Sequence, residues 1–102
     1  LSGNHLTPDV LDDYLAMQDE RVDYITQHVP ALAEQVRYAR VSYMISMVER
    51  IETGDAIHCE KQLEYMKNFL CQHADELLDT RWTTERETRL MQTYILKNEV
   101  LS

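Results

Sequence analysis

The sequence has very few of the residues that bend or cross-link a chain. Its 102 residues include only two glycines, two prolines and two cysteines. β-Rich domains need more turn residues than this, so the composition favours helices. The hydrophobic share of 44% is typical of a globular protein, and the length suits one domain with a core of its own. We therefore expect a single all-α domain over residues 1–102.

Positive charge is also scarce. Ten Lys and Arg residues stand against 18 Asp and Glu residues, which gives a formal net charge of −8. Such an acidic chain repels the phosphates of nucleic acids and the anionic surfaces of membranes. No apolar run approaches the roughly 20 residues that a membrane-spanning helix requires. The sequence therefore argues against nucleic acid and membrane partners.

The two cysteines predict neither a disulfide nor a metal site. Cys59 and Cys71 would lie about 18 Å apart in one helix, whereas the Cα atoms of a disulfide lie within about 7 Å. The same separation keeps the pairs His58–Cys59 and Cys71–His73 from sharing one zinc ion. Free thiols are typical of a reducing compartment. We therefore expect a cytoplasmic protein with no metal and no cofactor.

Catalytic motifs are missing as well. The chain has no glycine-rich loop that could hold a phosphate, and no serine stands in the nucleophile context of hydrolases. The chain has four histidines, and sequence spacing pairs none of them with a nucleophile or with a residue that would orient the imidazole for catalysis. The sequence therefore predicts a protein that is not an enzyme and has no catalytic residues.

The first two predicted helices are separated by a proline. Thr7 with Pro8 is a strong helix start, and Pro30 interrupts the helix that begins there. Apolar residues recur between the two prolines at helical spacing: Leu11, Leu15, Val22, Ile25 and Val29. The acidic residues of this segment lie on the opposite face of the helix. This face is either a solvated surface or a binding site for a basic partner. A second helix should run from about residue 30 to 52. Gly54 lies just past its end, where a glycine in the left-handed conformation commonly caps a helix.

Two further helices complete the prediction. Asp55 is a candidate N-cap for a third helix over about residues 55–79, and Thr84 with Glu87 has the spacing of a capping box for a fourth helix. Acidic and near-neutral helices alternate along the chain, which favours a four-helix up-down bundle. Residues 1–6 should form a flexible tail. The chain begins with Leu, and its last predicted helix runs to Val100-Leu101. Either the apolar end of this helix docks on the bundle, or the chain is a fragment of a longer protein.

The second helix is the most informative segment, because it is apolar on almost every side. Six large apolar residues lie within eight positions: Val41, Tyr43, Met44, Ile45, Met47 and Val48. This helix is either the centre of the bundle or part of a contact with a second chain. We expect a symmetric homodimer, the commonest oligomer. The predicted interface consists of Ala39, Tyr43, Met44, Met47 and Val48.

The leading functional hypothesis is a protein–protein interaction and dimerisation module that acts as an adaptor or regulatory domain. The first alternative is a small-molecule sensor with an inter-helix pocket lined by Tyr38, Tyr43 and Met66, since bundles build ligand sites between facing helices. The second alternative is a transcriptional regulator that uses the arginines at the start of the fourth helix: Arg81, Arg86 and Arg89.

Overall fold

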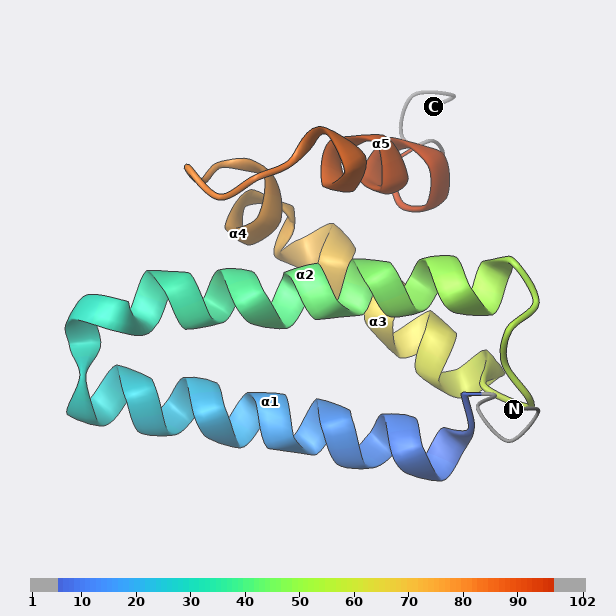
Figure 1. Ribbon diagram of the computed structural model, residues 1–102, viewed down its shortest axis with the longest axis horizontal. Coiled ribbons are helices and arrows are strands. Elements are labelled where there is room, and N and C mark those ends of the chain that lie inside the picture. Colours follow the sequence, from blue (N-terminus) through green and yellow to red (C-terminus); the bar gives the residue numbers. More distant parts are fainter. Residues whose placement is uncertain (1–5, 97–102) are drawn as a thin grey trace.

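A computed structural model describes residues 6–96 of the chain, and this part is all-α, as the sequence predicts (Figure 1). Within it lie five α-helices and one 3-10 turn: α1 (Pro8–His28), η2 (Pro30–Leu32), α2 (Ala33–Glu52), α3 (Glu60–Gln72), α4 (Ala74–Leu78) and α5 (Glu85–Tyr94).

Helix α2 is the centre of the fold. It packs against α1, α3, α4 and α5. Helices α1 and α2 form an antiparallel hairpin closed by η2, and α3 crosses α2 obliquely on one side of that hairpin (Figure 1). Helices α4 and α5 lie along the edge of α2 that faces away from α1. The bundle is therefore arranged around one helix, and α3 does not run alongside its neighbours.

The ends of α2 and α5 follow their local sequence signals. Gly54 has a φ of +94° and directly follows the C-cap of α2. Its N–H donates to the carbonyl oxygen of Ile51 at 3.1 Å, and the N–H of Asp55 donates to Arg50 at 2.9 Å, which is the Schellman pattern. Helix α5 begins with the predicted capping box between Thr84 and Glu87, and both of its hydrogen bonds are present. These two predictions are confirmed.

The third predicted helix is wrong at its start and is divided near its end. Asp55 does not cap it, because its carboxylate instead pairs with the Arg50 guanidinium at 2.8 Å. Helix α3 begins only at Glu60, and a break at His73 separates it from α4. The chain between α2 and α3 is held by a tertiary contact: the N–H of Ile57 donates to the carbonyl oxygen of Leu6 at 3.0 Å.

The two chain ends also differ from expectation. Leu6, placed in the predicted flexible tail, is buried in the core, while the rest of that tail lies outside the described residues. Helix α5 ends at Tyr94. The predicted continuation to Val100-Leu101 likewise lies outside the described residues.

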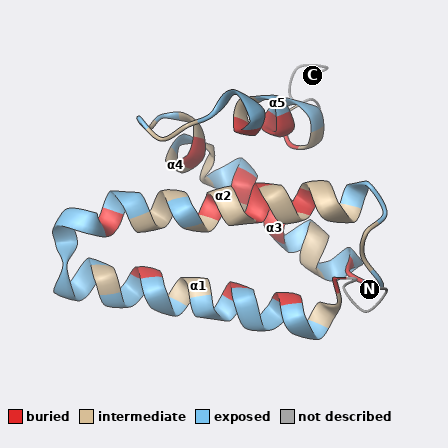
Figure 2. Ribbon diagram, in the orientation of Figure 1, coloured by how far each residue is buried: buried red, intermediate tan, exposed pale blue. Residues whose placement is uncertain are grey.

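The core is a single cluster to which every α-helix contributes (Figure 2). The largest fully buried side chains are Leu11, Met44, Ile45, Met66, Leu70, Leu77, Met91, Val41 and Val48. Polar contacts link the helices around this cluster. Arg40 of α2 reaches Asp19 of α1 at 3.0 Å and Glu76 of α4 at 3.8 Å, and its guanidinium lies over the Phe69 ring of α3. One arginine on the central helix therefore contacts three of its neighbours.

Candidate functional site

The structure separates the predicted interface residues of α2 into two groups. Met44 and Val48 are fully buried in the core of their own chain. Ala39 is exposed, and Tyr43 and Met47 are half-buried (Figure 2). The central position of α2 therefore accounts for its apolar character, and Met44 and Val48 present no surface to a second chain. Ala39, Tyr43 and Met47, four residues apart in sequence, follow one side of the helix.

An exposed apolar stripe lies on α1, and the sequence analysis missed it. Four large side chains are between 45% and 62% exposed at successive steps of four, three and seven residues: Val10, Tyr14, Met17 and Tyr24. Arg21 and His28 continue the same spacing and are also exposed. Steps of three and four residues place all six on one side of a helix. We call these six residues the α1 stripe.

The α1 stripe is distinct from the face with which α1 packs on the core. Leu11, Leu15 and Val22, which are buried, lie about 100° or more around the helix from the centre of the stripe. Asp12 and Asp19, which border α3, lie nearly opposite the stripe. Helix α1 therefore has three faces: one in the core, one beside α3 and one apolar face in solvent.

The stripe continues onto α2 through a pair of tyrosines. The ring centroids of Tyr14 and Tyr43 are 5.9 Å apart and their planes are tilted by 47°. Burial, followed by the nearby Tyr14 hydroxyl, raises the pKa of Tyr43, so its ring stays uncharged at neutral pH. Together with Ala39, Tyr43 and Met47, the α1 stripe forms one surface across two helices, which we call the hairpin face.

The charges of the hairpin face are few. Arg21 has no ion pair among residues 6–96. The ring of His28 lies 4.3 Å from that of Tyr24, centroid to centroid, at the far end of the stripe. Asp13 and Glu20 border the stripe on the side away from α2. The face is thus an apolar strip with one cation near its middle and carboxylates along one edge.

A second notable cluster surrounds Glu87, which is 4% exposed. Its carboxylate accepts hydrogen bonds from the Tyr38 hydroxyl at 2.8 Å, from the Ser42 hydroxyl at 2.5 Å and from the backbone N–H of Thr84 at 3.1 Å. Burial alone would raise the pKa of Glu87, but these hydrogen bonds outweigh it and leave the pKa below its usual value. Glu87 is therefore a buried, ionised link between α5 and α2.

The predicted ligand-pocket residues have other roles. Met66 is fully buried in the core, and the hydroxyl of Tyr38 is engaged with Glu87. Tyr43 lies at the surface beside Tyr14. The structure does not gather these three side chains around any of its described hollows, whose lining residues are different.

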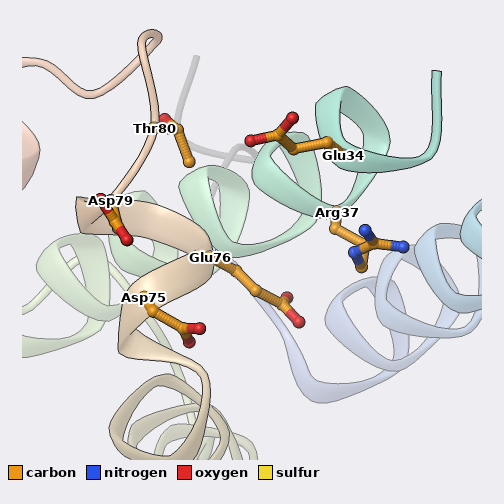
Figure 3. A pocket seen from close by; sticks show the side chains of 6 residues that line it. All are labelled: Glu34, Arg37, Asp75, Glu76, Asp79 and Thr80. Carbon is orange, nitrogen blue, oxygen red and sulfur yellow. The ribbon is translucent and has the colours of Figure 1, made fainter. Parts of the chain in front are cut away.

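One described hollow lies between the start of α2 and the segment from α4 to Thr80. It has a volume of about 350 Å³ and is lined by Glu34, Arg37, Asp75, Glu76, Asp79 and Thr80. Figure 3 shows the Glu76 carboxylate extending toward the side on which Arg37 lies. A second hollow of about 350 Å³ lies between α1 and α3 and is lined by Asp12, Leu15, Ala16, Asp19, Lys61, Gln62 and Tyr65. We call this second hollow the α1–α3 groove.

Comparison with known proteins adds no assignment. This chain matches no known protein family, no curated protein and no solved structure. Its function must therefore be argued from its own surfaces.

Two of the three arginines proposed for nucleic acid binding make contacts with other described residues. Arg86 pairs with Glu49 of α2 at 2.6 Å and lies 3.3 Å from the Ser46 hydroxyl. The Arg81 guanidinium lies over the ring of Trp82 at 5.0 Å. Arg89 is exposed. The contacts of Arg86 help to hold α5 against α2.

No group of three or more His, Cys, Asp or Glu side chains in residues 6–96 is placed to hold a metal ion. Burial raises the pKa of the Cys59 thiol, which lies beneath the chain that leads into α1. None of the described helices combines the length and the apolar character needed to cross a membrane.

Proposed function

We propose that this protein is a protein–protein interaction module that forms a homodimer through its hairpin face and acts as an adaptor or regulatory domain. The observation that carries the proposal is the α1 stripe, in which four of the six side chains are large, apolar and about half exposed. Scattered exposed apolar residues are normal on a monomer, but a contiguous row along a helix is typical of a contact surface.

The partner that fits this surface is a second copy of the chain. Steps of three and four residues are the spacing with which helices pack on one another. A two-fold axis brings the same face of two copies together, so one apolar strip can supply both halves of the contact. Arg21, the cation near the middle of the face, makes no ion pair within residues 6–96, and it is long enough to keep its charge in solvent while its stem packs on apolar surface.

The area of the hairpin face is suited to a modest dimer. A helix of 21 residues is about 30 Å long, and two helices packed about 10 Å apart present a face roughly 20 Å wide. The product is about 600 Å² per copy, somewhat below the roughly 800 Å² per partner of a standard interface. Buried area alone does not set affinity, but interfaces of this small size are typical of weak complexes, so we expect a dimer that dissociates in the micromolar range.

Light scattering over a concentration series, with matched substitutions, tests this proposal. Tyr14 and Tyr65 are 46% and 45% exposed, but Tyr65 lies on α3, away from the hairpin face. Tyr14→Glu places a carboxylate inside the proposed contact and should give a monomer, because a charge buried without a partner costs several kcal/mol. Tyr65→Glu should dimerise as the unmodified protein does.

Two results would contradict the proposal. One is an unmodified protein that stays monomeric up to high micromolar concentration. The other is a Tyr14→Glu protein that dimerises as strongly as Tyr65→Glu. Far-ultraviolet circular dichroism of both variants confirms that each remains helical, so that loss of the dimer is not mistaken for loss of the fold.

A further inference from the structure

We infer that the α1–α3 groove is a second binding site, which takes a basic amphipathic helix from a different protein. The groove lies on the side of α1 opposite the α1 stripe, because Asp12 and Asp19 are nearly half a turn around the helix from Val10 and Met17. A partner in the groove and a second copy on the hairpin face would therefore not compete for the same surface of α1.

The floor of the groove is apolar. Leu15 and Ala16 of α1 and Tyr65 of α3 line it, and Tyr65 remains 45% exposed although its neighbours on α3 include core residues. A hollow of about 350 Å³ accommodates a few apolar side chains from one face of a helix. This part of the site selects for a partner with an apolar stripe.

A side-chain hydrogen bond joins the two helices that form the groove. The side-chain amide of Gln62 donates to the Asp12 carboxylate at 3.0 Å, which ties α3 to α1. The Oε1 atom of the same amide is buried and accepts no hydrogen bond in the structure of residues 6–96. Because this atom has almost no accessible surface, the amide of Gln62 holds the wall of the groove through Asp12 and offers no acceptor to a partner.

The charge around the groove favours a basic partner. Helix α1 carries six acidic residues and one arginine. Asp12 and Asp19 stand at the groove itself, against the single cation of Lys61. Arg40 of α2 pairs with Asp19 at 3.0 Å and offsets part of its charge, so Asp12 and the acidity of α1 as a whole supply most of the attraction for a basic partner. A helix with lysines or arginines beside its apolar stripe would complement both the floor and the rim.

A synthetic helical peptide of leucine and lysine, with one apolar stripe, serves as the probe. Fluorescence anisotropy should show saturable binding to the unmodified protein that weakens as salt is added. The same peptide with glutamate in place of lysine should not bind. A flexible lysine–glycine peptide of equal charge should bind at least about tenfold more weakly, since it lacks the apolar stripe.

Two alanine-to-arginine substitutions separate this site from the proposed dimer face. Ala16 lines the groove and Ala39 lies on the hairpin face, and both are exposed. Ala16→Arg should raise the dissociation constant of the leucine–lysine peptide at least about tenfold, because it fills the groove and repels lysine. The same variant should leave the dimer intact. Ala39→Arg should weaken the dimer and leave peptide binding unchanged.

The outcomes distinguish the two proposals. Equal binding of the peptide to the Ala16→Arg and unmodified proteins would overturn the groove as its site, as would equal binding of the flexible lysine–glycine peptide. A protein that is monomeric at every concentration but still binds the peptide through Ala16 would overturn the dimer and leave the groove standing.

Discussion

Replacing Glu87 with alanine should destabilise the protein much more than replacing its neighbour Glu85. Both residues lie in the first turn of α5, but Glu85 is exposed, whereas Glu87 is buried and accepts hydrogen bonds from α2. The substitution removes the acceptor for the Ser42 hydroxyl and one half of the capping box with Thr84. It leaves Tyr38 with an alternative acceptor, the backbone carbonyl of Trp82 at 3.0 Å.

The expected loss can be estimated from these contacts. Loss of the reciprocal cap costs about 1 kcal/mol, and a partly buried hydroxyl without its acceptor costs about 2 kcal/mol. The hydroxyl of Tyr38 adds little, since it keeps a partner. The free energy of unfolding should therefore fall by about 3 kcal/mol, out of the 5–15 kcal/mol that is typical of a domain. At 4–8 °C per kcal/mol for a chain near this length, the melting temperature should fall by about 12–24 °C.

Urea unfolding followed by tryptophan fluorescence measures this change directly. Trp82 is the single tryptophan of the chain, and its ring lies 5.8 Å from that of Tyr38 in the same cluster. The Glu85→Ala protein is the matched control and should lose less than about 0.5 kcal/mol, as is usual for exposed positions. If the two variants differ by less than about 1 kcal/mol, Glu87 does not link α5 to α2 in the way that we describe.

The same carboxylate should make stability depend on pH. Although burial raises the pKa of Glu87, its hydrogen bonds hold the folded-state pKa below the unfolded value, which is about 4.3. Its contribution is therefore fully present above about pH 5 and is lost as the pH falls through the lower folded-state pKa. In urea titrations below about pH 4, the unmodified protein should lose stability more steeply than Glu87→Gln, which cannot ionise. Parallel curves for the two proteins would argue against an ionised, hydrogen-bonded Glu87.

Two further substitutions test the cap of α2 and the core. Gly54→Ala should cost about 1–2 kcal/mol in urea unfolding, because φ is +94° there while no atom obstructs an added methyl group; an unchanged midpoint would exclude the left-handed cap. Met66→Ala should cost about 2–5 kcal/mol, because Met66 is fully buried. A loss below about 1 kcal/mol would mean that α3 is not packed on the core as we describe.

Much of the helical pattern could be predicted because its signals are local. A glycine at a helix end and a Thr-x-x-Glu box act through hydrogen bonds within a few residues, so Gly54 and Thr84 mark real helix ends. Asp55 misled the same reasoning. Its carboxylate pairs with Arg50, and the chain just after it is held by a contact with Leu6, about fifty positions earlier. A distant contact of this kind leaves no trace in local spacing.

The candidate site was harder to predict, because an apolar residue looks the same in sequence whether it is buried or exposed. The apolar sides of α2 suggested an interface, yet Met44 and Val48 are fully buried in the core, and α1, α3, α4 and α5 all pack on this helix. The stripe of Val10, Tyr14 and Met17 was visible in the spacing of the first helix. The prediction did not use this spacing, because it assigned one apolar face to the helix. Leu11 and Leu15 lie on that face.

Short segments of the sequence are enough to establish that this protein is helical, where α1 begins, where α2 ends, where α5 begins, and that α1 is acidic, since composition, caps and charge are local properties. The packing of the helices settles which apolar surfaces remain in solvent. It places α2 at the centre, leaves the α1 stripe uncovered and opens the α1–α3 groove, because burial depends on how many neighbours pack around a helix.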